Sequence, residues 1–182
     1  ATGIFAFYKS FYLAQPQHAL YYQQPRTINE FELTDHQGQS FNKESLLGKW
    51  SWVFFGYTSC PDICPTTLQK FNFIYDDLKQ LNNNTQVLLV SVDPNRDTQE
   101  KLASYIGYFN PEFIALRADH GVLFPFARNL GLMYAINDGK QQDGNSKGDS
   151  DSYLVGHSAS LVLINPAGDI SAIFKPKHVL GE

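Results

Sequence analysis

The sequence predicts an α/β fold, in which a mixed β-sheet is flanked by helices and a β-hairpin is added at the amino end. Compact apolar runs, each typical of a buried strand, alternate along the chain with segments whose apolar residues recur at helical spacing. The chain has 182 residues, which suffice for one domain with its own hydrophobic core. Its two cysteines are therefore not needed as a scaffold.

The first half of the chain predicts a hairpin, two strands and a helix. Residues 31–42 have apolar residues on either side of a His-Gln-Gly turn, and residues 50–55, WSWVFF, are typical of a buried central strand. From Pro65 to Leu81 apolar residues recur at helical spacing, and the proline suits the first turn of a helix. Residues 87–92, VLLVSV, predict a second buried strand.

The second half continues the alternation. Residues 97–109 predict a helix, with Asp97 or Thr98 as its cap. A turn signal, Asn-Pro-Ala-Gly at 165–168, separates two strand-like segments and indicates a terminal hairpin. The remaining expectations are a third strand within 113–119, a helix at 120–130 interrupted near Pro125, a fourth strand at 132–136, a polar loop at 137–152, and hairpin strands within 153–164 and 169–175.

The charge and the amino-terminal segment bear on whether the chain binds nucleic acid or a membrane. The net charge is −4 and the basic residues form no run, so no nucleic-acid partner is expected. No window reaches the roughly 18 consecutive apolar residues that a membrane span requires. We expect residues 1–26 to be a tether or the remnant of a trimmed membrane anchor, or else a segment that packs on the surface, and residues 27–182 to form the domain.

Both cysteines lie where the predicted central strand turns into a helix. Cys60 and Cys64 are separated by three residues within FFGYTSCPDICPTTL, residues 54–68. The dipole at a helix amino terminus stabilises a thiolate, so the position predicts a lowered cysteine pKa. Four positions of helix rise about 6 Å, which permits either a disulfide or two ligands on one metal ion.

Two thiolates suit a soft ion such as Cu(I), and an imidazole is the obvious third ligand. Of the five histidines, His157 is the candidate, because it lies in YLVGHSASLVLI, a segment expected to pack beside the central strand and face the cysteines. The other histidines are interpreted as surface residues: His18, His36, His120 and His178.

Three separated motifs resemble the Sco family, also called SenC or PrrC, of copper-binding proteins. They are FFGYTSCPDICPTTL at 54–68, SVDPNRDT at 91–98 and YLVGHSASLVLINPAG at 153–168. The resemblance runs in order from about residue 27 to the end, and three motifs are far more specific than a lone pair of cysteines.

The resemblance implies a thioredoxin-like domain that helps to deliver copper to the binuclear copper centre of cytochrome c oxidase. By motif, Cys60, Cys64 and His157 are the expected copper ligands. Asp93 matches an acidic residue near the site, with a role in orienting a ligand or contacting a partner. One departure is Gly156, which stands where the family often has an acidic residue before the histidine.

The resemblance also implies partners and a location. The expected partners are the copper-site subunit of cytochrome c oxidase, a thioredoxin-like thiol reductase and other copper chaperones, with the chain itself a monomer. A reductase is implied because oxidising compartments favour a disulfide, which must be reduced before copper binds. The expected location is the periplasmic face of a bacterial inner membrane, through an amino-terminal anchor, or alternatively the mitochondrial intermembrane space.

Two other classes of function remain open. A thiol-disulfide oxidoreductase or a redox sensor would use Cys60 and Cys64 as its redox pair, although such enzymes usually have two residues rather than three between the cysteines. A peroxidase related to peroxiredoxins would need an arginine near one cysteine, and the sequence places none of its candidates there: Arg96, Arg117 and Arg128.

Overall fold

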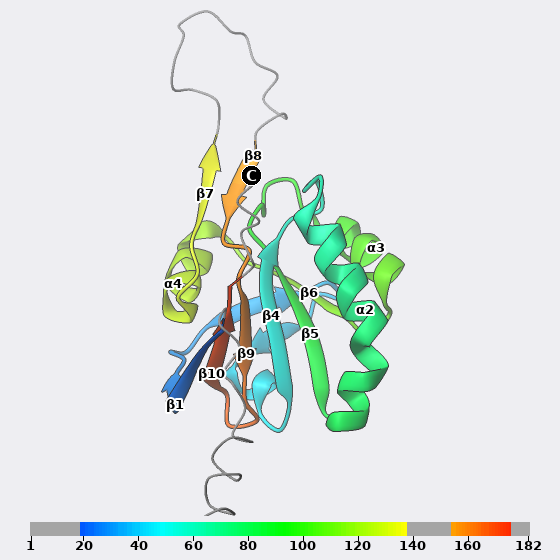
Figure 1. Ribbon diagram of the computed structural model, residues 1–182. Helices are drawn as coiled ribbons and strands as arrows, with labels where there is room; N and C mark the ends of the chain where they lie inside the picture. The colour runs from blue at the N-terminus through cyan, green and yellow to red at the C-terminus, as the bar shows by residue number, and fades with distance from the viewer. Residues whose placement is uncertain (1–18, 138–153, 176–182) are drawn as a thin grey trace, which may run out of the picture.

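The computed structural model describes residues 19–137 and 154–175, and its elements alternate between strands and helices as expected (Figure 1). In chain order the elements are β1 (Ala19–Thr27), β2 (Glu32–Asp35), β3 (Ser40–Asn42), the 3₁₀-helix η1 (Lys43–Leu46), β4 (Trp50–Gly56), α2 (Ile63–Leu81), β5 (Thr85–Ser91), α3 (Gln99–Phe109), β6 (Ile114–Arg117), α4 (His120–Leu130), β7 (Tyr134–Asn137), β8 (Leu154–His157), β9 (Leu161–Ile164) and β10 (Asp169–Phe174).

An eight-stranded mixed sheet organises the molecule, in the order β1-β10-β9-β4-β5-β6-β2-β3. Strands β4, β5 and β6 are parallel, while β9 and the hairpin strand β2 pair antiparallel on either side of them. The predicted α/β class with a mixed sheet and an added hairpin is therefore confirmed.

Helices pack on both faces of this sheet (Figure 1). Consecutive residues of β4 serve opposite faces: Phe54 joins the apolar cluster under α2 and α3, and Phe55 joins the cluster that includes α4. Because both faces are covered, the central strand is an almost continuous apolar run rather than an alternating one. The carboxyl end of β4 leads directly into the cysteine loop.

Several local predictions hold at residue level. The turn of the β2–β3 hairpin contains Gly38 at φ 84°, a left-handed conformation that favours glycine. Helix α3 is capped by Thr98, whose hydroxyl accepts a hydrogen bond from the Lys101 N–H. Helix α2 begins at Ile63, two residues before the expected start, and Pro65 lies in its first turn. Helix α4 runs through Pro125 as one element, although an interruption was expected there.

Strand β1 lies in the segment expected to be a tether or a packed surface segment. It pairs antiparallel with β10 at the edge of the sheet, and its register shifts between Tyr21 and Arg26. Its residues are mostly exposed and include Pro25, which an edge strand tolerates. An exposed edge strand needs no apolar alternation, so the sequence carried no strand signal. Residues 1–18 lie outside the described residues.

Strands β7 and β8 form a separate two-stranded antiparallel sheet beyond the main one. The sequence predicted a strand at 132–136 and a single hairpin strand within 153–164. The structure divides the second into β8, which pairs with β7, and β9, which pairs with β4 in the main sheet. The polar loop expected at 137–152 lies almost entirely outside the described residues. Within the described parts of the chain, no helix has the length and apolar character needed to cross a membrane.

Candidate metal centre

The loop between β4 and α2 carries the two cysteines. The Cys60 N–H donates a hydrogen bond to the Tyr57 carbonyl oxygen at 3.1 Å, which closes a tight turn. Cys64 is the second residue of α2. Cys60 is 9% exposed and Cys64 only 1% exposed, and both thiols are free. Both thiols are thus almost enclosed, with Cys60 nearer to solvent.

Gly56 at the end of β4 makes room for Cys64. A Cβ at this position would lie 2.8 Å from the Cys64 Sγ and 2.9 Å from Leu89 Cδ1, closer than real Cβ contacts permit. The missing side chain therefore lets the first turn of α2 seat its thiol directly against the central strand.

His157 approaches from the β7–β8 sheet rather than from the main sheet. It is the last residue of β8, and it lies opposite Tyr134 of β7 in the antiparallel register. The following Ser158 N–H donates to the Met133 carbonyl oxygen at 2.8 Å, which continues the pairing by one residue. Strand pairing therefore fixes the backbone that carries the imidazole.

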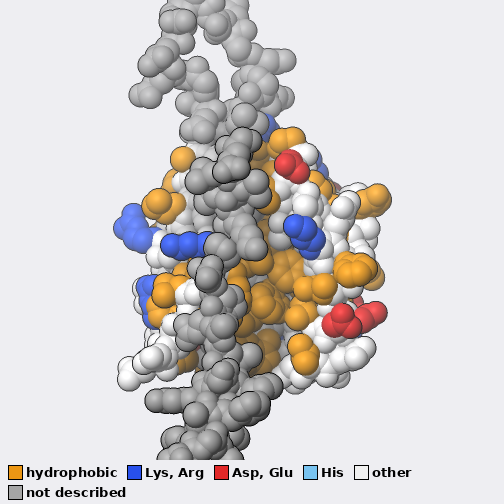
Figure 2. All heavy atoms as spheres, viewed as in Figure 1, with side chains coloured by type: hydrophobic (Ala, Val, Ile, Leu, Met, Phe, Trp, Pro, Cys, Tyr) orange, Lys and Arg blue, Asp and Glu red, His pale blue; other side chains and the backbone are white. Residues whose placement is uncertain are grey.

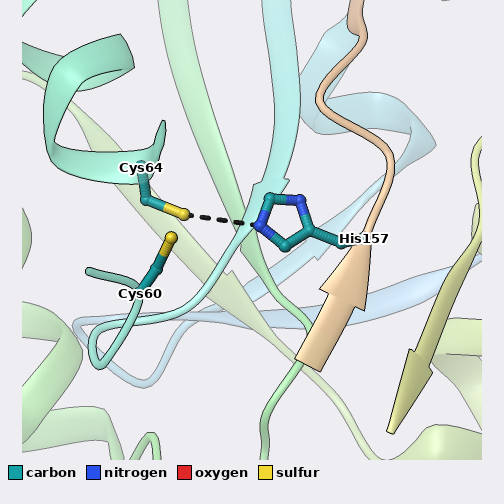
Figure 3. Close-up of side chains that lie close together, drawn as sticks. All are labelled: Cys60, Cys64 and His157. Carbon is teal, nitrogen blue, oxygen red and sulfur yellow. Dashed lines mark hydrogen bonds between the residues drawn. The ribbon is translucent and has the colours of Figure 1, made fainter. Parts of the chain in front are cut away.

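The three side chains converge on one point (Figure 3). The Cys64 Sγ and His157 Nε2 are 3.6 Å apart, although 93 positions separate these residues in the chain. The two sulfurs and a ring nitrogen all lie within 4.8 Å of one another, and they form the metal-ligating group found among the described residues. The structure thus brings together the three predicted ligand candidates.

Protonation in the metal-free state follows from burial. Burial raises the pKa of the Cys64 thiol, with the neighbouring Cys60 adding to the effect, so the expected lowering at a helix amino terminus is wrong. Burial also lowers the pKa of His157. The His157 Nδ1 lies 3.2 Å from the Ser158 carbonyl oxygen, which can only accept, so Nδ1 carries the proton. The lone pair of Nε2 therefore faces the sulfur.

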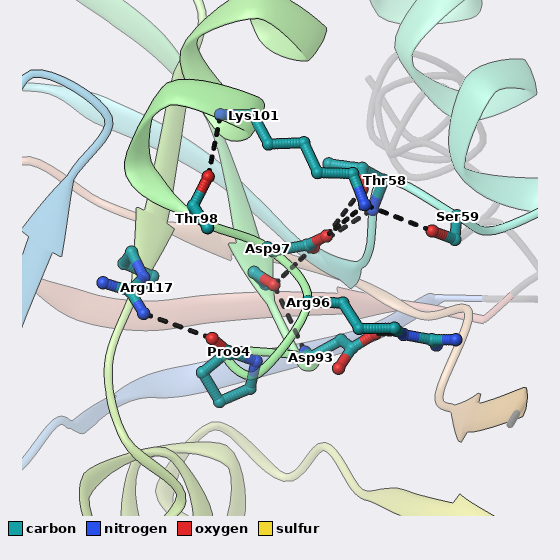
Figure 4. Close-up of polar contacts among 10 residues, drawn as sticks. Thr58, Ser59, Asp93, Pro94, Arg96, Asp97, Thr98, Lys101 and Arg117 are labelled. Carbon is teal, nitrogen blue, oxygen red and sulfur yellow. Dashed lines mark hydrogen bonds and ion pairs between the residues drawn. The ribbon is translucent and has the colours of Figure 1, made fainter. Parts of the chain in front are cut away.

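Asp93 lies near this group but not within it. It is 1% exposed and its carboxylate pairs with the Arg96 guanidinium (Figure 4). The Arg96 guanidinium carbon lies 5.8 Å from the centre of the Tyr57 ring, and that ring contacts His157 edge-on at 6.0 Å. The Arg96 and Tyr57 side chains thus connect Asp93 to His157.

Asp97 is a residue that sequence reasoning missed as part of the site. Its buried carboxylate accepts hydrogen bonds from the Thr58 N–H at 3.1 Å, the Thr58 hydroxyl at 2.6 Å and the Ser91 hydroxyl at 2.7 Å (Figure 4). The sequence suggested only a helix cap. No local signal could reveal this role, because Thr58 lies 39 positions away.

The other candidates lie elsewhere. His36 accepts a hydrogen bond from the Ala115 N–H at 3.2 Å, and His120 Nδ1 lies 2.9 Å from the Tyr134 hydroxyl, so neither joins the group. Arg117 donates to the Pro94 carbonyl oxygen at 3.2 Å, and Arg128 is exposed on α4. His18 and His178 are outside the described residues.

The sequence is similar to a family of known proteins. The model of the SCO1/SenC family matches residues 20–180. A SCO2-like protein of Rickettsia prowazekii is 34% identical over 172 residues, covering 91% of this chain and 80% of that protein. The mitochondrial SCO1 homolog of Homo sapiens is 30% identical over 154 residues, covering 84% of this chain but only 48% of the human protein. The chain thus spans about half of that relative.

Solved structures show the same fold. The crystal structure of Arabidopsis thaliana ScoI with copper bound has a TM-score of 0.71 at 28% identity, covering 83% of this chain and 89% of that one. BsSco, a member of the Sco family of cytochrome c oxidase assembly proteins in which a disulfide switch is described, shares the fold at 19% identity with a TM-score of 0.61. The thioredoxin-like fold that the resemblance implied is confirmed.

Proposed function

Because the chain belongs to the SCO1/SenC family, we propose that it binds one copper ion through Cys60, Cys64 and His157 and delivers it during cytochrome c oxidase assembly. The observation that carries the proposal is the convergence of two sulfurs and one imidazole nitrogen within 4.8 Å. The copper-bound state of ScoI supports the choice of metal.

The number of ligands favours copper over a structural zinc ion. Thiolate and imidazole ligands bind both metals, but a structural zinc site takes four protein ligands. The group among the described residues offers three, which suits trigonal Cu(I). At neutral pH the Cys64 thiol carries a proton that copper must displace, because burial raises its pKa. Binding therefore releases at least one proton.

Partial exposure supports transfer by ligand exchange. Cys64 is enclosed, whereas Cys60 is 9% exposed and His157 is half-buried. A ligand of a receiving protein can enter on the side of Cys60 and His157 and take the ion stepwise. The receiver is the copper-site subunit of the oxidase, with other copper chaperones as copper donors. Asp93 orients the site through Arg96 and Tyr57.

The two thiols bear on the cellular compartment and on the need for a reductase. In a bacterial periplasm or a mitochondrial intermembrane space, Cys60 and Cys64 oxidise readily, so a thioredoxin-like reductase keeps them able to bind copper. The chain acts there as a monomer held at the membrane through its amino-terminal segment. Relatives occur in both bacteria and mitochondria, and we favour the bacterial location.

A thiol-disulfide oxidoreductase or redox sensor is the second candidate function. Its support is the pair of free thiols, Cys60 and Cys64, at the strand-to-helix turn. Such a protein would reduce cysteines on a copper-site protein, and it has no need of His157.

The test is an anaerobic copper titration of the reduced chain, with Cu(I) and Cu(II) run separately. We expect one copper per chain, loss of binding in the Cys60→Ser, Cys64→Ser double variant, and at least about tenfold weaker binding in His157→Ala. His36→Ala is the matched control. Binding no tighter than in the double variant, together with rapid reduction of a disulfide substrate, would replace the copper role with the oxidoreductase role.

A further inference from the structure

An apolar groove runs along α2 beside the candidate metal centre. Its volume is about 280 Å³, and its walls come from α2, β4, β9 and β10. Figure 2 shows hydrophobic side chains gathered on this face of the molecule. Its apolar lining includes Trp52, Phe71, Ile74, Leu78, Leu161 and Phe174.

The groove forms where the described helices on this face leave part of the sheet uncovered. Helices α2 and α3 pack over the parallel strands, while α4 covers the opposite face (Figure 1). Within residues 19–137 and 154–175, no helix packs on the side of α2 that faces β9 and β10. Ile63 and Ile74 in its wall remain 40% and 39% exposed. Apolar side chains that stay exposed in a groove are available for contact with a partner.

The groove is continuous with the candidate metal centre. Ile63, Thr67 and Ala159 line both the groove and the small hollow formed by Cys64 and His157. A protein whose ligand reaches His157 through this hollow lies against the near end of the groove. The groove is thus placed to hold the partner during metal exchange.

The charged residues of the groove indicate which partner segment it can bind. Among the described residues, the charged side chains that line the groove are Lys70 and Lys175, both basic, although the chain as a whole has a net charge of −4. We propose that the groove docks an apolar segment flanked by carboxylates, presented by the copper-receiving domain of the oxidase subunit. The inference rests on the proposed function and adds the surface by which the receiver is held.

The first test compares neighbouring residues on one helix. Ile74→Glu places a charge in the groove, about 15 Å along the helix axis from Cys64. Phe73→Glu is the matched control, because Phe73 is 87% exposed and does not line the groove. Binding of the copper-loaded chain to the copper-free copper-site domain of a bacterial oxidase subunit is measured by calorimetry, and copper transfer by absorbance. We expect at least tenfold weaker binding and slower transfer for Ile74→Glu alone.

A second pair tests charge. Lys70→Glu should weaken binding and flatten its salt dependence, whereas Lys49→Glu, at an exposed position outside the groove, should not.

Equal behaviour of Ile74→Glu and Phe73→Glu would overturn the inference, as would copper loading without transfer to this domain. A wild-type dimer that Ile74→Glu dissociates would assign the groove to a second copy. Failure of the wild-type chain to bind copper would instead refute the proposed function.

Discussion

The Asp97 carboxylate accepts two hydrogen bonds from Thr58, one from its N–H at 3.1 Å and one from its hydroxyl at 2.6 Å. Thr58 lies two residues before Cys60, so this carboxylate ties the cysteine loop to the start of α3. The Ser91 hydroxyl donates to the same carboxylate at 2.7 Å, which links the end of β5 as well. The position of Cys60 thus depends on a residue that would touch no metal.

Removing this carboxylate should loosen the loop. Asp97→Ala leaves three donors of Thr58 and Ser91 without their charged acceptor, and we expect the free energy of unfolding to fall by about 3 kcal/mol. Urea denaturation measures this loss, and thiol labelling should show Cys60 reacting faster. Asp77→Ala, at an exposed position of α2, is the control. Wild-type stability and labelling in Asp97→Ala would refute the role of this carboxylate.

Filling the space at Gly56 should displace Cys64. The added Cβ of Gly56→Ala would lie 2.8 Å from the Cys64 Sγ, so we expect a loss of about 1–3 kcal/mol in unfolding free energy and weaker copper binding. Gly107→Ala is the matched control, because a Cβ there meets nothing within 4 Å and improves helix propensity in α3. Urea denaturation and competition with a Cu(I) chelator measure both effects. Equal behaviour of the two variants would contradict the prediction.

The stability of the reduced, metal-free chain should fall in alkali. Burial holds the pKa of Cys64 above that of an unfolded thiol, about 8.5, so the folded chain binds more protons above this pH. Stability is therefore full below about pH 8.5 and falls as the pH rises, by about 1 kcal/mol by pH 9.5. Urea denaturation across this range measures the slope. Cys64→Ser should remove it and Cys60→Ser should keep it; the reverse result would assign the effect to Cys60.

The Tyr134 hydroxyl should support the strand that carries His157. It lies 2.9 Å from His120 Nδ1, and its ring stacks on Phe124 at 4.6 Å. Tyr134→Phe keeps the stacking but removes the hydrogen bond, so we expect a loss of about 1 kcal/mol in unfolding free energy and modestly weaker copper binding. Denaturation and Cu(I) competition measure the two effects. Tyr108→Phe, at an 82% exposed position, should change neither. Unchanged copper binding in Tyr134→Phe would separate this hydrogen bond from the site.

Local patterns predicted the part of the site that local structure builds. The apolar run of β4, the turn with its prolines and the periodicity of α2 are all contained in a short stretch, so the strand, the cysteine loop and the helix could be expected in their observed order. His157 was placed beside the cysteines mainly through the resemblance of motifs. Its distance from Cys64, 93 positions along the chain, exceeds what periodicity can connect.

Tertiary contacts determined what could not be predicted. The pairing of β7 with β8, the addition of exposed β1 to the sheet edge and the anchoring of Thr58 by Asp97 each join distant segments. The predicted lowering of the Cys64 pKa was wrong for the same reason. The sequence shows a helix start, which favours the thiolate, but not the burial against Gly56 that outweighs it.

Because 93 positions separate Cys64 and His157, an ion bound by both would also affect the stability of the fold. A metal held by both residues acts as a reversible cross-link across that length of chain. In the chain-entropy model, closing a loop of this size restricts the unfolded state by about 4–5 kcal/mol, as a disulfide would. Under the proposed function, release of copper to a receiver would therefore also remove a stabilising cross-link from the fold.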